Sequence, residues 1–66
     1  MDTMARLNEL REERGLSMYR LAIICDVPYS SLKYTARNHG QLSVDTIERI
    51  CFGLEIPMAE FFAEVK

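Results

Sequence analysis

The stretch that decides the fold of this chain is Leu16–Gly40, which reads LSMYRLAIICDVPYSSLKYTARNHG. It is typical of two short helices joined by a tight turn. Ser17 is a good N-cap for the first helix, and Pro28 opens the second, where its fixed φ and missing N–H cost nothing. Asp26 stands in the turn, and aspartate tolerates a left-handed backbone better than most residues. The stretch therefore predicts a helix pair whose second member, over about residues 28–37, has a free outer face.

Three further helices are expected around this pair. The first covers about residues 2–14 and stops at Gly15, where a glycine just past the last turn is common. Ser43 caps a helix that follows the pair, and Pro57 starts the last one. No segment alternates with period two, so no sheet is expected. The sequence predicts an all-α fold, a compact bundle of about five short helices in one domain over residues 1–66.

Apolar residues at helical spacing supply the expected core. They are Leu7, Leu10, Leu16, Leu21, Val27, Leu32, Ile47, Ile50 and Leu54. Three finer expectations concern single positions. Asn38 takes the left-handed position that ends the helix over residues 28–37, Val44 belongs to the apolar stripe of the helix after Ser43, and Arg6 lies on the polar side of the first helix.

Length and composition bound the class of protein. Sixty-six residues make one domain at most, near the lower limit at which a chain buries enough apolar area to fold without disulfide bonds or a structural metal. No apolar run approaches the roughly 18 residues of a membrane span. The start, MDTMARLNEL, lacks the basic flank and apolar stretch of a signal peptide. A soluble, cytoplasmic protein is expected.

Cys25 and Cys51 lie in apolar contexts, AIICDV and RICFGL, rather than in a spaced framework. With a single histidine, His39, they offer no zinc pattern. We expect two reduced core thiols, no metal and no cofactor. A disulfide or a redox role is the alternative.

Charge is distributed unevenly along the chain. The formal net charge is −2, which argues against a nucleic-acid partner at first sight. Residues 14–42, however, carry four basic side chains against Asp26 alone, a balance of +3, while residues 1–13 and 43–66 are acidic. The basic side chains are Arg14, Arg20, Lys33 and Arg37. Because the local field matters more than the total, the helix pair is the part suited to a polyanion; a chance distribution is the alternative.

The outer side of the helix over residues 28–37 is polar. Its side chains are Tyr29, Ser30, Lys33, Tyr34 and Arg37. A short helix held across another, with its outer face free, is how small proteins place side chains in the DNA major groove. The sequence therefore favours a DNA-binding function.

Five motifs in register extend this interpretation over nearly the whole chain. They are Arg6-Leu7, Leu10-Arg11 and Gly15-Leu16-Ser17; Leu21-Ala22; Val27-Pro28-Tyr29-Ser30-Ser31-Leu32; Ser43, Thr46, Ile47 and Ile50; and Leu54, Ile56, Glu60, Phe61 and Phe62. In this order and spacing they resemble the Cro/C1-type (XRE) helix-turn-helix family of small phage and bacterial repressors. The resemblance implies a lambda-repressor-like domain and sequence-specific binding of double-stranded operator DNA.

The resemblance also implies which residues touch DNA. The expected base contacts are Tyr29, Ser30, Lys33 and Tyr34, whose hydroxyls, ring and ammonium suit base edges in the major groove. The expected phosphate contacts are Ser17, Arg37, Asn38, His39 and Arg11. For Tyr29 the alternative is a partly buried ring, for Lys33 a solvated charge, and for Ser17 a helix cap and nothing more.

Several positions depart from the family pattern. The glutamine that often begins the second helix and reaches a phosphate is Met18 here, and the glycine of the turn is Asp26. The glutamate that pairs with the arginine of the first helix is Ala36, so Arg11 is expected to be free for another acid or for phosphate. These departures bear on how tightly the protein binds an operator.

A partner surface is expected near the end of the chain. Phe61 and Phe62 cannot both be buried in one small core, so one packs inward and the other, together with Val65, is available for a dimer or partner contact. Ile23 or Ile24, of which one is expected to be exposed, could serve equally. Because single recognition helices bind weakly, a homodimer on DNA is expected.

Two other functions compete with a repressor-type regulator. The first is a protein-interaction module, of an antirepressor or partner-neutralising kind, that keeps the fold without binding an operator. The acidic total and the apolar Ile23-Ile24 favour it, whereas the absence of acids between Pro28 and Leu42 favours DNA binding. An enzyme is not expected, because no nucleophile–base pair, carboxylate pair, phosphate loop or metal cluster is visible.

Overall fold

Residues 1–63, the part of the chain that this computed structural model describes, fold into five helices and no strand. The helices are α1 (Thr3–Glu13), α2 (Met18–Cys25), α3 (Tyr29–Arg37), α4 (Val44–Leu54) and α5 (Met58–Phe62). The predicted all-α fold is confirmed, and each helix begins within a residue or two of its expected start. Val65, one of the residues expected on the partner surface, lies outside the described residues.

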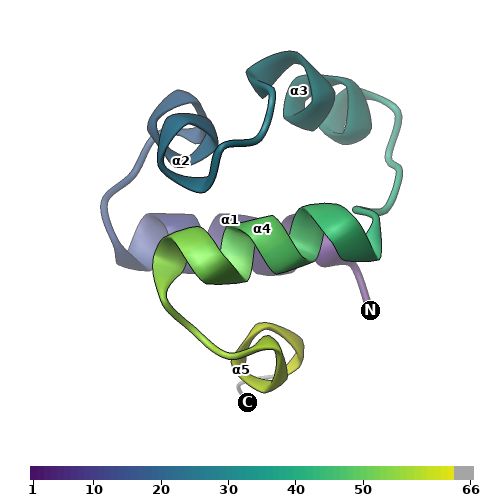
Figure 1. The fold of residues 1–66 in the computed structure, drawn as a ribbon. Helices are drawn as coiled ribbons and strands as arrows, with labels where there is room; N and C mark the ends of the chain where they lie inside the picture. Colours follow the sequence, from purple (N-terminus) through teal and green to yellow (C-terminus); the bar gives the residue numbers. More distant parts are fainter. Residues whose placement is uncertain (64–66) are drawn as a thin grey trace.

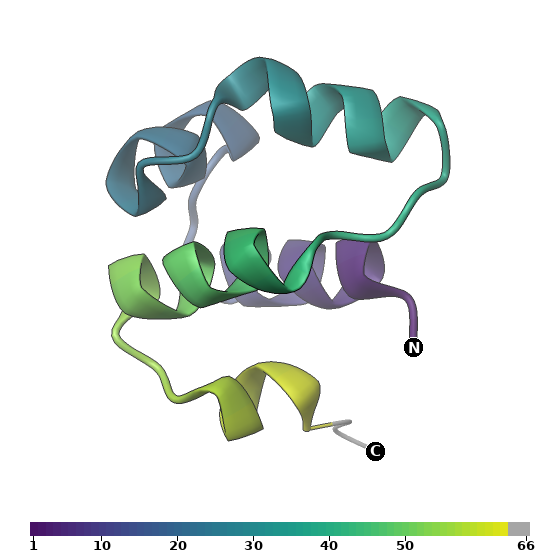
Figure 2. The same cartoon turned by 45° about the vertical axis from the view of Figure 1, so that its right-hand side comes forward.

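The helices are arranged in three layers (Figure 1). α1 and α4 form the middle layer, α2 and α3 cover one side of it, and the short α5 covers the other (Figure 2). α2 packs most extensively on α4, and α5 contacts both α4 and α1. The helix pair therefore rests on a platform of two helices, which fixes its orientation.

Side-chain caps begin three of the helices. The Oδ1 of Asp2 accepts from the N–H of Ala5, and the Oγ of Ser17 accepts from the N–H of Arg20, each at 3.1 Å. Ser43 caps α4 in the same way. These bonds satisfy N–H groups that have no partner within their helix, which is why the helices start at the predicted places.

A left-handed residue ends α2, as predicted, but the one that follows α3 is not the predicted one. Asp26 has a φ of 56°, whereas Asn38 has a φ of −95° and His39 takes the left-handed conformation with a φ of 55°. The side-chain amide of Asn38 donates to the carbonyl of Tyr34 at 2.8 Å. That bond holds Asn38 beside the last turn of α3, so the reversal comes one residue later.

The core is one cluster drawn from all five helices and two loops. Its members are Met4, Leu7, Leu10, Leu21, Ala22, Cys25, Val27, Leu32, Leu42, Ile47, Ile50, Cys51 and Phe61. Of the expected core residues, Leu16 and Leu54 are only half-buried. Val44 is 63% exposed, so its assignment to the apolar stripe is wrong. It is the first residue of α4, almost a full turn before Ile47, and nothing covers it there.

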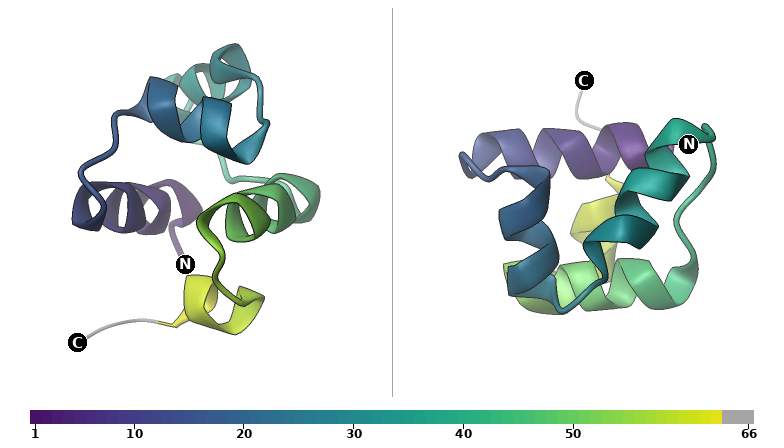
Figure 3. Two further views of the ribbon diagram at one scale, coloured as in Figure 1. Left: turned by 60° about the vertical axis from the view of Figure 1, so that its left-hand side comes forward. Right: turned by 90° about the horizontal axis from the view of Figure 1, so that it is seen from above.

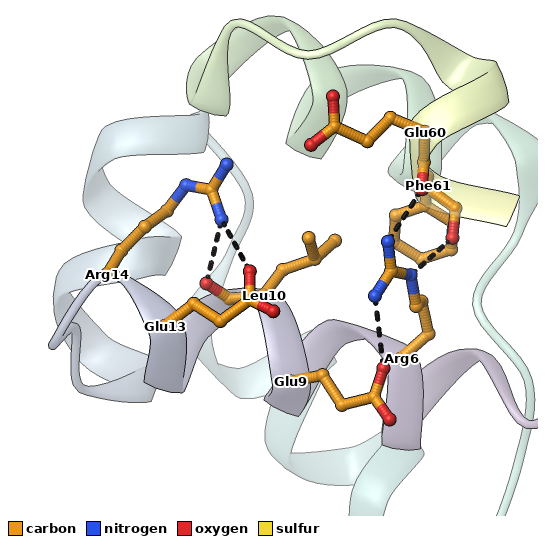
Figure 4. Close-up of polar contacts among 7 residues, drawn as sticks. All are labelled: Arg6, Glu9, Leu10, Glu13, Arg14, Glu60 and Phe61. Carbon is orange, nitrogen blue, oxygen red and sulfur yellow. Dashed lines mark hydrogen bonds and ion pairs between the residues drawn. The ribbon is translucent and has the colours of Figure 1, made fainter. Parts of the chain in front are cut away.

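Arg6 is buried, which the sequence did not predict. Its Nε and Nη2 donate to the carbonyls of Phe61 and Glu60 at 2.7 and 2.6 Å, and its Nη1 pairs with Glu9 at 3.0 Å (Figure 4). The placement of Arg6 on the polar side of α1 is therefore wrong. The rigid guanidinium fork binds two successive carbonyls of α5, which holds this one-turn helix against α1.

The N-terminus is tied to the connector between α3 and α4. The Oε1 of Gln41 accepts from both the N–H and the hydroxyl of Thr3, at 2.9 and 2.6 Å. The hydroxyl oxygen of Thr3 in turn accepts from the N–H of the buried Leu42 at 2.8 Å. These bonds fix the segment that follows α3 and so help to hold that helix in place.

At Gly53, α4 approaches the backbone of α2 closely. A Cβ at this position would lie 2.7 Å from both the Cα and the Sγ of Cys25. We expect Gly53→Ala to lower the free energy of unfolding by about 1–3 kcal/mol, because the backbone of α2 has to move. Gly40→Ala is the matched control, since its Cβ would meet nothing closer than 3.7 Å. Urea unfolding followed by circular dichroism measures both, and equal stability of the two variants would contradict this packing.

The two cysteines are free and buried, as predicted. Burial, and then the nearby Cys51 thiol, raise the pKa of the Cys25 thiol from 9.0 to about 11. The folded state therefore keeps this proton over a pH range in which the unfolded chain loses it. The corresponding stability is present below pH 9 and is lost as the pH rises from 9 to 11.

This linkage predicts a pH-dependent difference between two proteins. Over that range the free energy of unfolding of the wild type should fall more than that of Cys25→Ala, by about 2 kcal/mol. Urea titrations at pH 8, 9.5 and 11 measure the two slopes. Parallel slopes would show that Cys25 ionises equally in both states.

Candidate nucleic-acid interface

The outer face of α3 is open to solvent along its length. Leu32 is its one buried side chain, and Ser30, Lys33 and Tyr34 are exposed, with Tyr34 at 68%. Seen from above, no other described helix lies over α3 (Figure 3). Three of the four predicted base-contacting side chains are therefore presented together on one free surface.

Tyr29 is only 38% exposed, because its ring meets an aromatic neighbour. The rings of Tyr19 and Tyr29 pack edge to face, with centroids 5.3 Å apart and planes at 89°. The Nζ of Lys33 lies 5.5 Å from the Tyr29 ring centroid, a cation–π distance. The Tyr29 ring is thus covered on one side by Tyr19 but remains exposed, with the ammonium of Lys33 beside it. The contact between Tyr19 and Tyr29 was not predicted from the sequence.

Ser30 and Tyr34 line a shallow hollow on α3 together with Ser31 and Thr35. The hydroxyl of Thr35 donates to the carbonyl of Ser31 at 3.0 Å, so it is occupied within the helix. The hydroxyls of Ser30 and Tyr34 make no hydrogen bond within residues 1–63 and are available to a ligand. Both can donate to or accept from a base edge.

The end of α3 places a basic group beside a reversal of the chain. Arg37, Asn38 and His39 are all exposed. The side-chain amide of Asn38 is engaged by Tyr34, and the left-handed His39 turns the chain away from the helix. Of the three predicted phosphate contacts here, Arg37 has the most suitable chemistry, because its guanidinium has no recorded partner among residues 1–63.

Ser17 caps α2, the role that was the alternative to a phosphate contact. Its Oγ accepts from the N–H of Arg20, while the residue itself is exposed at the start of α2. An exposed helix N-terminus favours an anion, and Arg20 adds a charge one turn away. The capping role does not prevent a phosphate from lying against the same turn.

Arg11 is engaged within the protein, and the expected pairing with another acid is present, because its Nη2 lies 3.8 Å from the Oε2 of Glu12. Its Nη1 donates to the carbonyl of Leu16 at 2.9 Å, and its Nε donates to the Oδ1 of Asn8 at 3.2 Å. Its side chain is 22% exposed. Ala36 stands where the family often has a glutamate that pairs with this arginine. Here the guanidinium binds the loop before α2 instead, so Arg11 helps to hold the start of the helix pair.

The predicted partner contacts divide between core and surface. Phe61 is fully buried, so it belongs to the core and cannot be a contact, whereas Phe62 is 44% exposed. Ile23 and Ile24 are both exposed, at 57% and 43%. The expectation that one phenylalanine packs inward is confirmed. One isoleucine was expected to be exposed, whereas both are.

No helix among residues 1–63 has the length and apolar character needed to cross a membrane. Within the same residues, no group of three or more histidine, cysteine, aspartate or glutamate side chains could hold a metal ion.

One known protein is similar to this chain over almost its whole length. The HTH-type transcriptional regulator SutR of Escherichia coli (strain K12) is 34% identical over 68 residues, an alignment that covers 96% of this chain. The chain spans only 38% of the length of that relative. No family model and no solved structure matches the chain. The similarity to a helix-turn-helix regulator thus agrees with the helix pair seen in the structure.

Proposed function

We propose that this protein is a sequence-specific, double-stranded-DNA-binding transcriptional regulator of the Cro/C1 (XRE) type that acts as a repressor. The observation that carries the proposal is the free outer face of α3, which presents Ser30, Lys33, Tyr34 and Arg37 with no acidic residue in that helix. The similarity to a helix-turn-helix transcriptional regulator supports it.

In the proposed complex α3 lies in the major groove. The hydroxyls of Ser30 and Tyr34 and the ammonium of Lys33 then meet base edges, while Arg37 and the N-terminus of α2 at Ser17 meet phosphates on either side. The platform of α1 and α4 keeps these contacts in one geometry. Because one short helix reads few base pairs, we propose that two copies bind adjacent half-sites, about one helical turn apart.

A second function has one observation in its favour. Ile23, Ile24 and Phe52 are exposed apolar side chains on the α2–α4 side of the molecule, and such side chains often mark a protein contact. The second candidate is therefore an interaction module that retains the fold without binding an operator.

Selection from randomised DNA duplexes separates the two. A DNA-binding regulator enriches one sequence, and a dimer enriches it with two-fold symmetry. The affinity for the enriched duplex, measured by fluorescence anisotropy, should fall steeply between 50 and 200 mM salt. Failure to enrich any sequence, with weak binding that does not depend on salt, would favour the interaction module.

A further inference from the structure

Phe52 is the most exposed large apolar side chain in the described part of the chain, at 86%. It lies on α4, and with Ile24 of α2 it edges a surface hollow of about 450 Å³ whose lining also includes Cys25. Phe52 is neither one of the proposed DNA-contacting residues nor a member of the core, so neither role accounts for a phenylalanine at this position. An aromatic ring left in water beside an apolar hollow is a candidate contact for another protein.

The hollow lies apart from the proposed base contacts. Its lining comes from the end of α2, the residue that follows it and α4, whereas Ser30, Lys33 and Tyr34 belong to α3. None of those three side chains lines it. A ligand in the hollow therefore need not compete with DNA for the same residues.

Acidic side chains surround the hollow. Asp26 and Glu48 belong to its lining. Asp45 lies seven residues before Phe52, two helical turns away on α4, and Glu55 follows the helix as its left-handed C-cap residue. Arg49 is the one basic residue in the lining, and it is already engaged, with its Nε 3.3 Å from Asp45 and its Nη1 donating to the Asp26 carbonyl at 3.3 Å.

The charge of this rim decides between two occupants. A second copy of the chain, packed through the same hollow, would bring a rim of the same net negative charge against this one, and like charges across an interface are unfavourable. A partner with lysine or arginine around an apolar anchor would meet complementary charge. We infer that the hollow between α2 and α4 docks a cationic amphipathic helix of a different protein, with one apolar side chain beside Phe52 and Ile24 and with basic side chains against Asp26 and Glu48.

A synthetic peptide tests this inference. The probe is an amphipathic peptide with leucine on one helical face and lysine on the other, titrated into the 15N-labelled protein. Saturable shifts are expected for the backbone amides of residues 24–26 and 48–52. Phe52→Ser should weaken binding about tenfold or more, and 0.5 M salt should weaken it as well. Val44→Ser is the matched control, because Val44 is also an exposed apolar residue of α4 but does not line the hollow.

Other outcomes would overturn the inference. They are the absence of saturable shifts, shifts centred elsewhere, equal weakening by Val44→Ser and Phe52→Ser, or equal binding of a peptide with glutamate in place of lysine. Shifts of the same amides on raising the protein concentration without peptide would identify a second copy as the occupant. Phe52→Ser should leave affinity for a selected DNA duplex unchanged, so this test and that of DNA binding fail independently.

Discussion

Replacing Arg6 with methionine is expected to lower the free energy of unfolding by about 3 kcal/mol, a large part of the stability of so small a domain. The carbonyls of Glu60 and Phe61 would lose their charged donor while the aliphatic volume of the side chain is kept. The fully buried Phe61, which depends on the position of α5, would be loosened as well. Urea unfolding followed by circular dichroism measures the change.

Two variants make this prediction specific. Arg6→Lys should recover only part of the loss, because an ammonium cannot reproduce the two parallel bonds of the guanidinium. Arg49→Met is the matched control; its side chain is 52% exposed, and such an ion pair contributes less than about 1 kcal/mol. If Arg6→Met were no less stable than Arg49→Met, Arg6 would not hold α5.

The second large effect concerns DNA. In the selected duplex, Lys33→Ala is expected to weaken binding by about 1–3 kcal/mol and to relax the sequence preference, because Lys33 is proposed to reach a base edge. Arg37→Ala should weaken binding to all duplexes alike and reduce the slope of log K against log salt by about 1, as expected for a lost phosphate contact. Fluorescence anisotropy at several salt concentrations measures both.

The control for charge is Arg49→Ala, which removes the same charge from an exposed residue of α4 rather than from α3. Its affinity and salt dependence should remain close to those of the wild type. If the three variants lost affinity to the same extent, net charge alone would govern binding, and α3 would not be the recognition helix.

The helices could be predicted because their signals are local. Ser17, Ser43 and Pro28 mark helix starts through bonds and dihedral angles within a few residues, and the structure follows them. The outer face of α3 could be predicted for the same reason, since the spacing along one helix determines which side chains share a face. Once Leu32 is assigned to the core, the polar side chains on the opposite side of α3 must face solvent.

The features that were missed depend on contacts between distant parts of the chain. Arg6 is buried because the carbonyls of α5, 54 and 55 residues away, need a donor there. Thr3 and Gln41 meet across 38 residues, and the packing of Tyr29 on Tyr19 depends on the angle between two helices. The spacing of residues within one helix does not contain this information. The same type of charged or aromatic residue can therefore lie on the surface or in the core.

Charge gives the molecule two different sides. The outer face of α3 is basic and polar, whereas the exposed side of α4 carries Asp45 and Glu48, and Glu55 follows directly after the helix. A polyanion is attracted to the first and repelled by the second, which orients the protein in an encounter with DNA. The net charge of −2 is therefore compatible with DNA binding, and it leaves the α4 side available to a cationic partner.

The most direct test of DNA recognition by α3 is a titration of the 15N-labelled protein with the selected duplex, followed residue by residue through its backbone amide signals. The largest shifts are predicted for residues 29–37 and for the first turn of α2 after Ser17, with α4 and α5 little affected. Shifts centred on α4 or α5, or none at a duplex concentration that saturates binding by anisotropy, would contradict the proposed DNA-binding surface.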